Sequence, residues 1–222
     1  MKLPQSLHIS LVFAWYRRPG IFTLLPSHTK EMHMDCPVLV IPGHGNSGPA
    51  HWQSVWQASS PNWHRLQVED WNHVVCNDWV SAIDRQLEEL GSTTLVVAHS
   101  LGCLALVHWA ARQARTIRGA LLVAVPDPAA AAFPASASIG FTPLPLQPLS
   151  FRSTVVTSTD DPYGSASYAR ACANAWRSAF VEAGARGHLN SDSGLGDWSD
   201  GYKLLETLAE SVQRPSGQMK ST

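Results

Sequence analysis

The hydrophobic positions of this chain fall into short, continuous apolar runs separated by longer stretches with helical spacing. Continuous apolar runs are typical of strands that are buried on both faces of a sheet. We therefore predict buried strands at 38–41, 94–97, 120–125 and 153–158, and a weaker strand at 65–68. Strands that alternate with helices predict an α/β fold, with a doubly wound, mostly parallel sheet and helices on both of its faces.

The apolar spacing between these runs predicts the helices. We expect one helix at 50–59, one that begins at Asn77 or Asp78 and ends at Gly91, and one that follows residue 101. An Ala-rich stretch predicts a helix over 165–183, and a last helix ends near Val212. Sheets of this kind bind ligands at the carboxyl ends of their strands, so we expect the site in the loops that follow the strands.

One of these loops holds the hexapeptide Val97-Ala98-His99-Ser100-Leu101-Gly102, between a strand and a helix. The order small residue, x, Ser, x, Gly in this position is the arrangement of a nucleophile elbow. The sharp turn holds the serine hydroxyl out of the sheet, where a base can remove its proton. Ser100 is therefore the candidate nucleophile, with Ala98 in place of the usual Gly. An ordinary turn with a capping serine is the alternative.

An orienting acid and a base should follow the serine in the chain order Ser, Asp, His. The strand at 153–158 is followed by Asp160 and Asp161, and a carboxylate at the carboxyl end of a strand points into the site. We select Asp161 because Pro162 fixes the chain directly after it, and Asp160 and Asp127 are the competing acids.

The candidate base is His188, which lies in the last long loop and follows the acid along the chain. Two other histidines lie close to the serine in the sequence. His108 falls on the helix after Ser100 and is expected to be structural. The side chain of His99, which precedes Ser100, is expected to point away from the site.

The loop after the first strand, Gly43-His44-Gly45-Asn46-Ser47-Gly48, supports two interpretations. Gly43, Gly45 and Gly48 form a literal G-x-G-x-x-G, and Asp70 lies where the acid of a dinucleotide-binding fingerprint would lie. However, Pro49 and Trp52 crowd the turn where a pyrophosphate would bind. This interpretation also leaves the elbow unexplained.

The second interpretation uses the same loop for acyl transfer. The reaction creates an oxyanion, which needs two preorganised N–H donors. One donor is the backbone of the residue after the nucleophile, and the other comes from the loop after an earlier strand. We predict an oxyanion hole formed by the backbone N–H groups of Leu101 and Asn46.

The composition argues against several classes of partner. With a formal net charge of −1, the 222-residue chain has no basic patch for nucleic acid or an anionic membrane. Its four cysteines have no CxxC or Cys/His spacing, so neither a metal site nor a disulfide framework is predicted, and all four are expected to be buried. We expect no metal, no cofactor and a reducing, cytoplasmic location.

Residues 1–33 differ from the rest of the chain, with four basic residues and one acidic residue. Their apolar stretch at 7–16 is too short to span a bilayer, and its arginine pair follows it, unlike the charge of a signal peptide. We expect a poorly ordered extension upstream of a start at Met32 or Met34. A weak membrane-surface or targeting role is the alternative. The domain is predicted at 34–214, with a disordered tail at 215–222.

The segment 126–150 breaks the alternation of strands and helices. It holds six prolines and a single charged residue, Asp127, and this proline density excludes a regular helix. We expect an apolar loop that covers the site and lines an acyl pocket with Phe133, Ile139, Phe141, Leu144, Leu146 and Leu149. A loop that only packs on the domain is the alternative.

Together these motifs carry a family resemblance. They are Pro-Gly-His-Gly-Asn-Ser at 42–47 with His51-Trp52, Ala-His-Ser-Leu-Gly at 98–102, Ser-Thr-Asp-Asp-Pro-Tyr at 158–163, Gly-His-Leu-Asn at 187–190 and Gly-Leu-Gly-Asp-Trp at 194–198. Over roughly residues 36–210 the chain resembles the small serine hydrolases related to retinoblastoma-binding protein nine and the bacterial YdeN proteins. The resemblance implies an α/β-hydrolase sheet shortened at its start and a triad of Ser100, Asp161 and His188. The segments 1–33 and 126–150 depart from the family pattern.

We therefore expect a metal-independent serine hydrolase that cleaves small carboxylic esters through an acyl-enzyme. His188 would act as general base and then as general acid, while Asp161 fixes its tautomer. Two alternatives remain, a catalytically idle interaction module with the same fold and a dinucleotide-binding protein.

Overall fold

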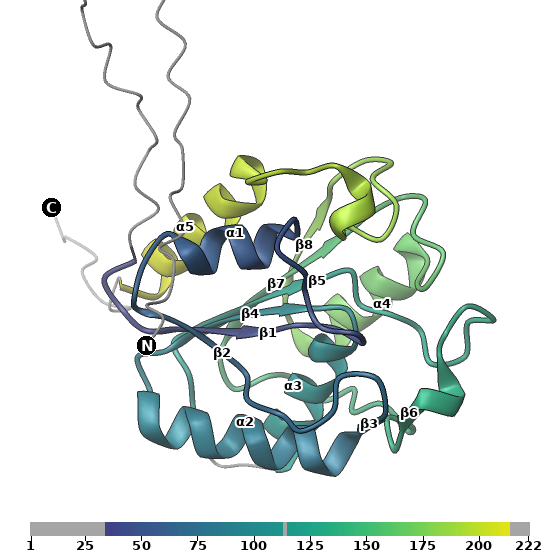
Figure 1. The fold of residues 1–222 in the computed structure, drawn as a ribbon, viewed down its shortest axis with the longest axis horizontal. Helices are drawn as coiled ribbons and strands as arrows, with labels where there is room; N and C mark the ends of the chain where they lie inside the picture. Colours follow the sequence, from purple (N-terminus) through teal and green to yellow (C-terminus); the bar gives the residue numbers. More distant parts are fainter. Residues whose placement is uncertain (1–33, 113–114, 214–222) are drawn as a thin grey trace, which may run out of the picture. The chain divides into compact units, whose positions relative to one another are not determined.

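A parallel sheet of six strands forms the centre of the protein (Figure 1). The computed structural model describes residues 34–112 and 115–213, so the predicted extension at 1–33 and tail at 215–222 lie outside the described residues. The strands lie side by side in the order β2 (Trp63–Arg65), β1 (Val38–Ile41), β4 (Leu95–His99), β5 (Gly119–Val123), β7 (Arg152–Thr157) and β8 (Ala179–Glu182). Every neighbouring pair in this sheet is parallel. The predicted α/β fold is confirmed.

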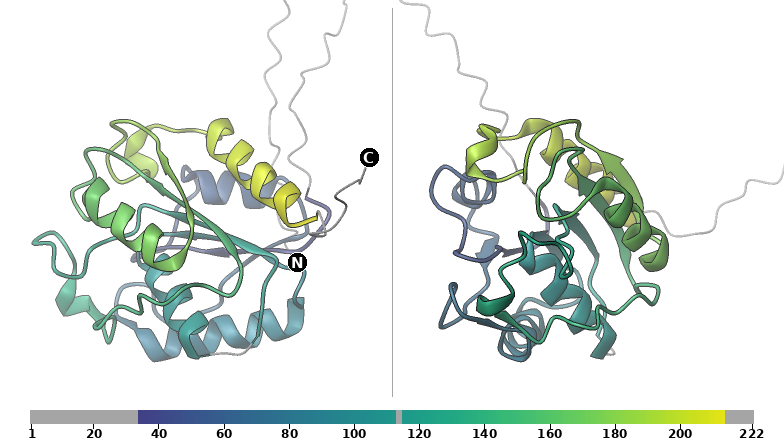
Figure 2. Two further views of the ribbon diagram at one scale, coloured as in Figure 1. Left: turned by 180° about the vertical axis from the view of Figure 1, so that it is seen from behind. Right: turned by 90° about the vertical axis from the view of Figure 1, so that its right-hand side faces the viewer.

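Helices cover both faces of this sheet (Figures 1 and 2). One face packs against α1 (Trp52–Ala58) and α5 (Ser199–Gln213), and the other packs against α2 (Cys76–Leu90), α3 (Leu101–Arg112) and α4 (Ala166–Trp176). None of the helices in the described ranges is both long and apolar enough to cross a membrane.

The central strands are apolar throughout because both of their faces are covered. In β1, Leu39 and Ile41 belong to the core on the α2–α3–α4 side, whereas Val38 and Val40 belong to the core on the α1–α5 side. All residues of β1, β4 and β5 are buried. This burial explains why the strands read as continuous apolar runs in the sequence.

One predicted strand and the start of one predicted helix lie at different positions in the structure. The strand expected at 65–68 is β2 and lies earlier, at Trp63–Arg65. The helix expected to begin at Asn77 or Asp78 begins at Cys76, and its N-cap, Val75, makes no side-chain capping bond. The reason is that Val75 ends a short strand, β3 (Val74–Val75), which leads directly into the helix. Gly91 ends α2 as predicted.

The helix predicted over 165–183 is wrong in its second half. It ends at Trp176, because Arg177 turns into the left-handed region with a φ of 57° and caps the helix. The chain then forms β8, whose backbone pairs with β7 at the edge of the sheet. The Ala-rich composition favours a helix, but pairing with an open sheet edge overrides that local preference.

The segment 126–150 is irregular, as its prolines predict, apart from a 3₁₀ turn and a two-residue strand. The 3₁₀ turn is η1 (Ala135–Ala137), and β6 (Ser138–Ile139) pairs with β3. The apolar side chains of the segment do not share one environment. Phe141 is buried in the main core, whereas Ile139 and Leu146 are 60% and 56% exposed.

Candidate active site

Ser100 stands at the turn between β4 and α3, as the sequence predicts. Its backbone φ is 54°, in the left-handed region, and its N–H donates to Val123 O of the neighbouring strand at 2.9 Å. A Cβ at Gly102 would lie 2.5 Å from Pro42 O and 2.6 Å from Ile41 O. Glycine is therefore required where α3 passes the end of β1, and this close crossing holds Ser100 at the carboxyl edge of the sheet.

The structure brings Ser100, His188 and Asp161 into one chain of contacts. His188 Nε2 lies 2.8 Å from Ser100 Oγ, and His188 Nδ1 lies 2.9 Å from both carboxylate oxygens of Asp161. The Asp161 side chain is 1% exposed and that of His188 is 10% exposed. Asp161 Oδ1 also accepts a hydrogen bond from the Tyr163 N–H at 2.9 Å. This is the geometry of a hydroxyl, a base and an orienting acid.

The two competing acids have other partners. Asp160 accepts hydrogen bonds from Ser158 Oγ at 2.6 Å and from the Gly187 N–H at 2.7 Å. These bonds lower the pKa of its carboxyl. Asp127 accepts from the Ala129 N–H at 2.8 Å and so closes a turn at the end of β5. Of the three carboxylates, Asp161 is the one in contact with the His188 ring.

His99 does not point away from the site, contrary to the prediction from the sequence. Its Nε2 lies 2.9 Å from the backbone oxygen of His188, and the two rings are 5.0 Å apart. The ring of His51 packs on His99 at 4.8 Å. The prediction failed because β4 ends at His99, so its side chain reaches the loop that carries His188.

His108, by contrast, is remote from these contacts. Its Nε2 lies 3.2 Å from the backbone oxygen of Phe141, which fits the structural role that the sequence suggests.

Leu101 and His44 both line the cavity at Ser100, and neither backbone N–H has an acceptor among the described residues. The Asn46 N–H, which the sequence selects, donates to Gly43 O at 3.2 Å within its own turn. A Cβ at Gly43 would lie 2.8 Å from Ser100 Cβ, so the loop touches the serine directly. The Asn46 N–H is therefore engaged within its own turn, whereas the His44 N–H is not.

Gln53 holds this loop in place and was not foreseen from the sequence. Its side chain is fully buried, and its Nε2 donates to Val97 O at 3.0 Å and to Ile41 O at 3.2 Å. Its Oε1 accepts from Ser47 Oγ at 2.6 Å. Gln53 thus connects the ends of β1 and β4 to the loop after β1. A polar residue in a short helix gives no sequence signal for such a role.

A cavity of about 500 Å³ opens above Ser100 and has two different walls. The apolar wall contains Leu101, Pro126, Ala132, Phe133, Pro134 and Tyr163, and the polar wall contains His44, Asn46, His51, His99, Asn190, Ser191 and Asp192. From the segment 126–150, only residues up to Pro134 line the cavity. The prediction that Phe141 lines it is wrong, because Phe141 packs beside His108 in the core.

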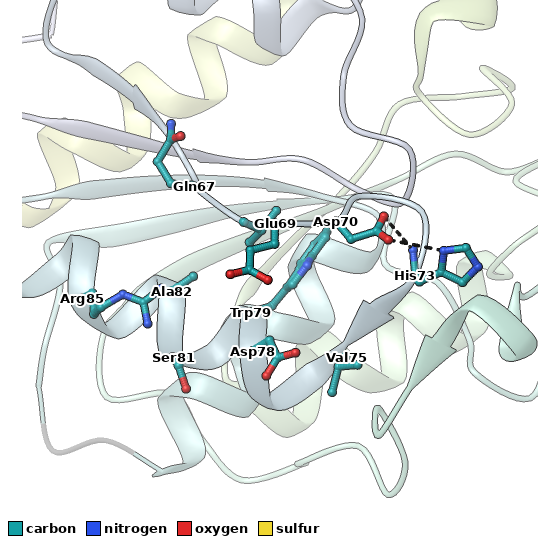
Figure 3. A pocket seen from close by; sticks show the side chains of 11 residues that line it. Gln67, Glu69, Asp70, His73, Val75, Asp78, Trp79, Ser81, Ala82 and Arg85 are labelled. Carbon is teal, nitrogen blue, oxygen red and sulfur yellow. Dashed lines mark hydrogen bonds and ion pairs between the residues drawn. The ribbon is translucent and has the colours of Figure 1, made fainter.

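A second hollow, of about 670 Å³, lies between the chain after β2 and helix α2 (Figure 3). Its lining mixes apolar and polar residues and includes the carboxylates of Glu69, Asp70 and Asp78. Its histidine, His73, lies 3.4 Å from Asp70, and its hydroxyl, Ser81 Oγ, donates to Asn77 O at 2.8 Å. The residues that line this hollow therefore form no hydroxyl–imidazole contact, whereas the cavity at Ser100 contains one between Ser100 and His188.

The described residues offer no second nucleophile of the thiol type and no metal centre. All four cysteines are buried, as predicted. Burial raises the pKa of Cys76 to about 11 and raises that of Cys103 further, which keeps both thiols protonated. In residues 34–112 and 115–213, no group of three or more His, Cys, Asp or Glu side chains is placed to hold a metal ion.

The Gly-rich loop lacks the geometry of a dinucleotide site. A Cβ at Gly48 would meet nothing within 4 Å, whereas the third glycine of that fingerprint serves close packing of helix on strand. The start of α1 is closed by the His51 ring, whose Nδ1 accepts from the Gln53 N–H at 3.2 Å. Asp70 accepts hydrogen bonds from the N–H groups of Asn72 and His73.

This fold, with a serine at a strand–helix elbow, defines the protein as an α/β-hydrolase. Residues 38–207 match the family model described as Serine hydrolase, so the chain belongs to this serine hydrolase family. The predicted membership in the small serine hydrolases is thereby confirmed. The relation to retinoblastoma-binding protein nine stays a prediction.

Solved structures agree with this assignment. The chain is 30% identical to a YdeN-like hydrolase from Pectobacterium atrosepticum, covering 80% of this chain and 92% of that one, with a TM-score of 0.71. It is 22% identical to the ydeN gene product of B. subtilis, covering 79% and 99%, with a TM-score of 0.64. An esterase from Thermogutta terrifontis shares the fold at 15% identity, covering 81% and 91%, with a TM-score of 0.60. No match to a curated protein was found.

The buried histidines make stability depend on pH. Burial, with smaller contributions from Arg65 and His188, lowers the pKa of His51 from 6.5 to about 4. In the unfolded chain His51 titrates near pH 6.5, so its contribution is fully present above that pH and is lost as the pH falls toward about 4. That contribution is on the order of 3 kcal/mol.

We predict that the free energy of unfolding in urea falls steadily between pH 6.5 and 4.5. His51→Asn should flatten this dependence, because Asn keeps a capping oxygen for α1 but does not titrate. His99 and His108, whose pKa values burial also lowers, should preserve part of the slope in both proteins. Parallel pH curves for the wild type and the variant would contradict the assignment to His51.

Proposed function

We propose that this protein hydrolyses small carboxylic esters through an acyl-enzyme on Ser100. The observation that carries the proposal is the contact chain from Ser100 Oγ through the His188 ring to Asp161, with distances of 2.8 and 2.9 Å. Three side chains from distant parts of the sequence converge at the carboxyl edge of the sheet, next to a cavity large enough for a small substrate.

In the proposed reaction His188 Nε2 takes the Ser100 proton as the oxygen attacks the ester carbonyl carbon. The resulting imidazolium is stabilised by Asp161, which also holds the proton on Nδ1 in the starting state. His188 then gives its proton to the leaving alcohol, and the acyl group remains on Ser100. Water, deprotonated by His188, attacks the acyl-enzyme and releases the carboxylic acid.

The oxyanion of each tetrahedral intermediate would be bound by the N–H groups of Leu101 and His44. Both groups lack an acceptor among the described residues, and Gly43 brings the His44 turn against Ser100. Preorganised donors of this kind contribute about 2.7–4 kcal/mol each to transition-state stabilisation. Leu101 is the donor that the sequence predicts, and we propose His44 in place of Asn46 because the Asn46 N–H donates to Gly43 O.

Substitutions at two carboxylates and the serine test the triad. Ser100→Ala should reduce kcat for p-nitrophenyl butyrate by several orders of magnitude with little change in the unfolding transition. Asp161→Asn should reduce kcat about 10⁴-fold, because the amide favours the wrong tautomer of His188. Asp127→Asn is the matched control, since the Asp127 carboxylate closes a turn at the end of β5 by accepting the Ala129 N–H, and it should retain most of the activity.

An active Ser100→Ala protein would disprove the proposed nucleophile. Comparable losses in Asp127→Asn and Asp161→Asn would disprove the proposed acid. A wild-type protein with no turnover on any ester of graded chain length would favour the idle interaction module.

The apolar wall predicts which acyl chains fit best. Phe133 is 9% exposed and lines the cavity, so it would contact an acyl chain bound beside Ser100. Each methylene buried there contributes up to ~0.8 kcal/mol, so kcat/KM should rise from acetate toward butyrate. Phe133→Ala should shift the preferred chain length.

Phe141→Ala is the control for this experiment, because Phe141 is buried in the core away from the cavity. It should lower the free energy of unfolding by about 3–5 kcal/mol and leave the chain-length profile unchanged. An unchanged profile in Phe133→Ala would show that residue 133 does not shape the acyl site.

A further inference from the structure

We propose that His99 is a positioning residue of this hydrolase, which ties the main chain of His188 to the elbow so that the imidazole meets Ser100. The proposal rests on the proposed function, because it assigns His99 a role in the same reaction. Trp52 supplies a second, weaker tie to the same loop.

Two consecutive carbonyl groups of the His188 loop are held by buried side-chain donors. His99 Nε2 lies 2.9 Å from His188 O, and Trp52 Nε1 donates to Leu189 O at 2.8 Å. Both donors lie on the rigid core, one at the end of β4 and one at the start of α1. The loop is thus fixed at two adjacent peptide units.

The backbone at this point needs such support. Leu189 has a φ of 49°, in a region that residues other than glycine rarely adopt, and its side chain is fully buried. Strained conformations of this kind persist only where surrounding contacts hold them. The ties at His188 and Leu189 contribute to this support, together with the bond from the Leu189 N–H to Arg186 O and the bond from the Gly187 N–H to Asp160.

The position of His99 in the sequence makes its tie direct. Ser100 Oγ meets the His188 side chain, and the adjacent residue, His99, meets the His188 main chain. A shift of the loop would change both distances together. Asp161 holds the other side of the His188 ring, and Asp160 holds the preceding residue through the Gly187 N–H. His99 acts on the main chain of His188 itself.

The hydrogen bond from His99 Nε2 to His188 O is compatible with the positive charge that the His188 ring takes up during the proposed reaction. A bond to a carbonyl oxygen requires a proton on His99 Nε2. Burial, together with the proximity of His188 and His51, lowers the pKa of His99 well below 6.5, so the ring is neutral. A neutral donor holds the loop without opposing the imidazolium that forms at His188 during turnover.

The packing around His99 leaves its ring little freedom. His51 contacts it edge-on with ring centroids 4.8 Å apart, and Trp52 lies edge-on at 6.0 Å. His51 is itself fixed as the N-cap of α1. The donor is therefore preorganised rather than recruited when substrate binds.

The test compares His99→Leu, which removes the donor, with His99→Gln, whose side-chain N–H can reach the same carbonyl. His99→Leu should lower kcat for p-nitrophenyl butyrate about 10- to 100-fold with KM nearly unchanged, because a displaced base affects the chemical step. His99→Gln should recover most of the loss. Trp52→Phe, which keeps an aromatic ring but removes the N–H, should lower kcat several-fold and provides the measurement if His99→Leu does not fold.

The matched control is His108→Leu, which removes another buried histidine that contacts a main-chain oxygen, away from Ser100. It should lower stability but not kcat. The proposal is overturned if His99→Leu keeps wild-type kcat, if His99→Gln is as impaired as His99→Leu, or if His108→Leu loses as much kcat. Ser100→Ala in the same assay separates failure of the His99 proposal from failure of the proposed function. An active Ser100→Ala protein overturns the proposed function itself, whatever the result for the His99 variants.

Discussion

The arrangement of this protein depends on the parallel pairing of its six strands, because parallel strands deliver the ends of five separate segments to one edge of the sheet. The glycine-rich loop follows β1, Ser100 follows β4, the apolar segment follows β5 and Asp161 follows β7. The loop that carries His188 follows β8. Residues as far apart as 100 and 188 meet only because the backbone pairing fixes these ends relative to one another.

Close packing at this edge requires local strain, which the surrounding contacts offset. Ser100 and Leu189 both have left-handed backbone conformations, each of which costs about 1–3 kcal/mol. Gly102 allows α3 to cross the end of β1, and buried side chains then hold the loops on either side. Gln53 holds the loop after β1, and His99 holds the loop that contains His188. The strained residues thus lie where the contact chain is assembled.

The sequence predicts those features that follow from local pattern and chain order. Apolar runs predict the positions of the strands. The loops that follow these runs predict the elbow at Ser100 and the chain order Ser100, Asp161, His188. Each of these signals lies within a short stretch of sequence. The structure brings the three side chains together as that order implies. Their catalytic roles remain a proposal.

The features that the sequence missed depend on contacts between distant segments. β8 forms because an open strand edge accepts Ala179–Glu182, which local composition cannot show. The direction of the His99 side chain follows from its place as the last residue of β4, beside the loop that carries His188. Some residues of the segment 126–150 line the cavity and others are buried in the core, and the path of the chain across the domain decides which.

The central claim is that Ser100 is made nucleophilic by His188, and covalent labelling tests it most directly. A fluorophosphonate should react with the native protein to form a bond between phosphorus and Ser100 Oγ, with loss of fluoride. Peptide mapping by mass spectrometry should find one adduct, on the peptide that contains Ser100, and His188→Ala should lose the reaction. An adduct on another residue, equal labelling of His188→Ala, or no adduct on the folded protein would contradict the account.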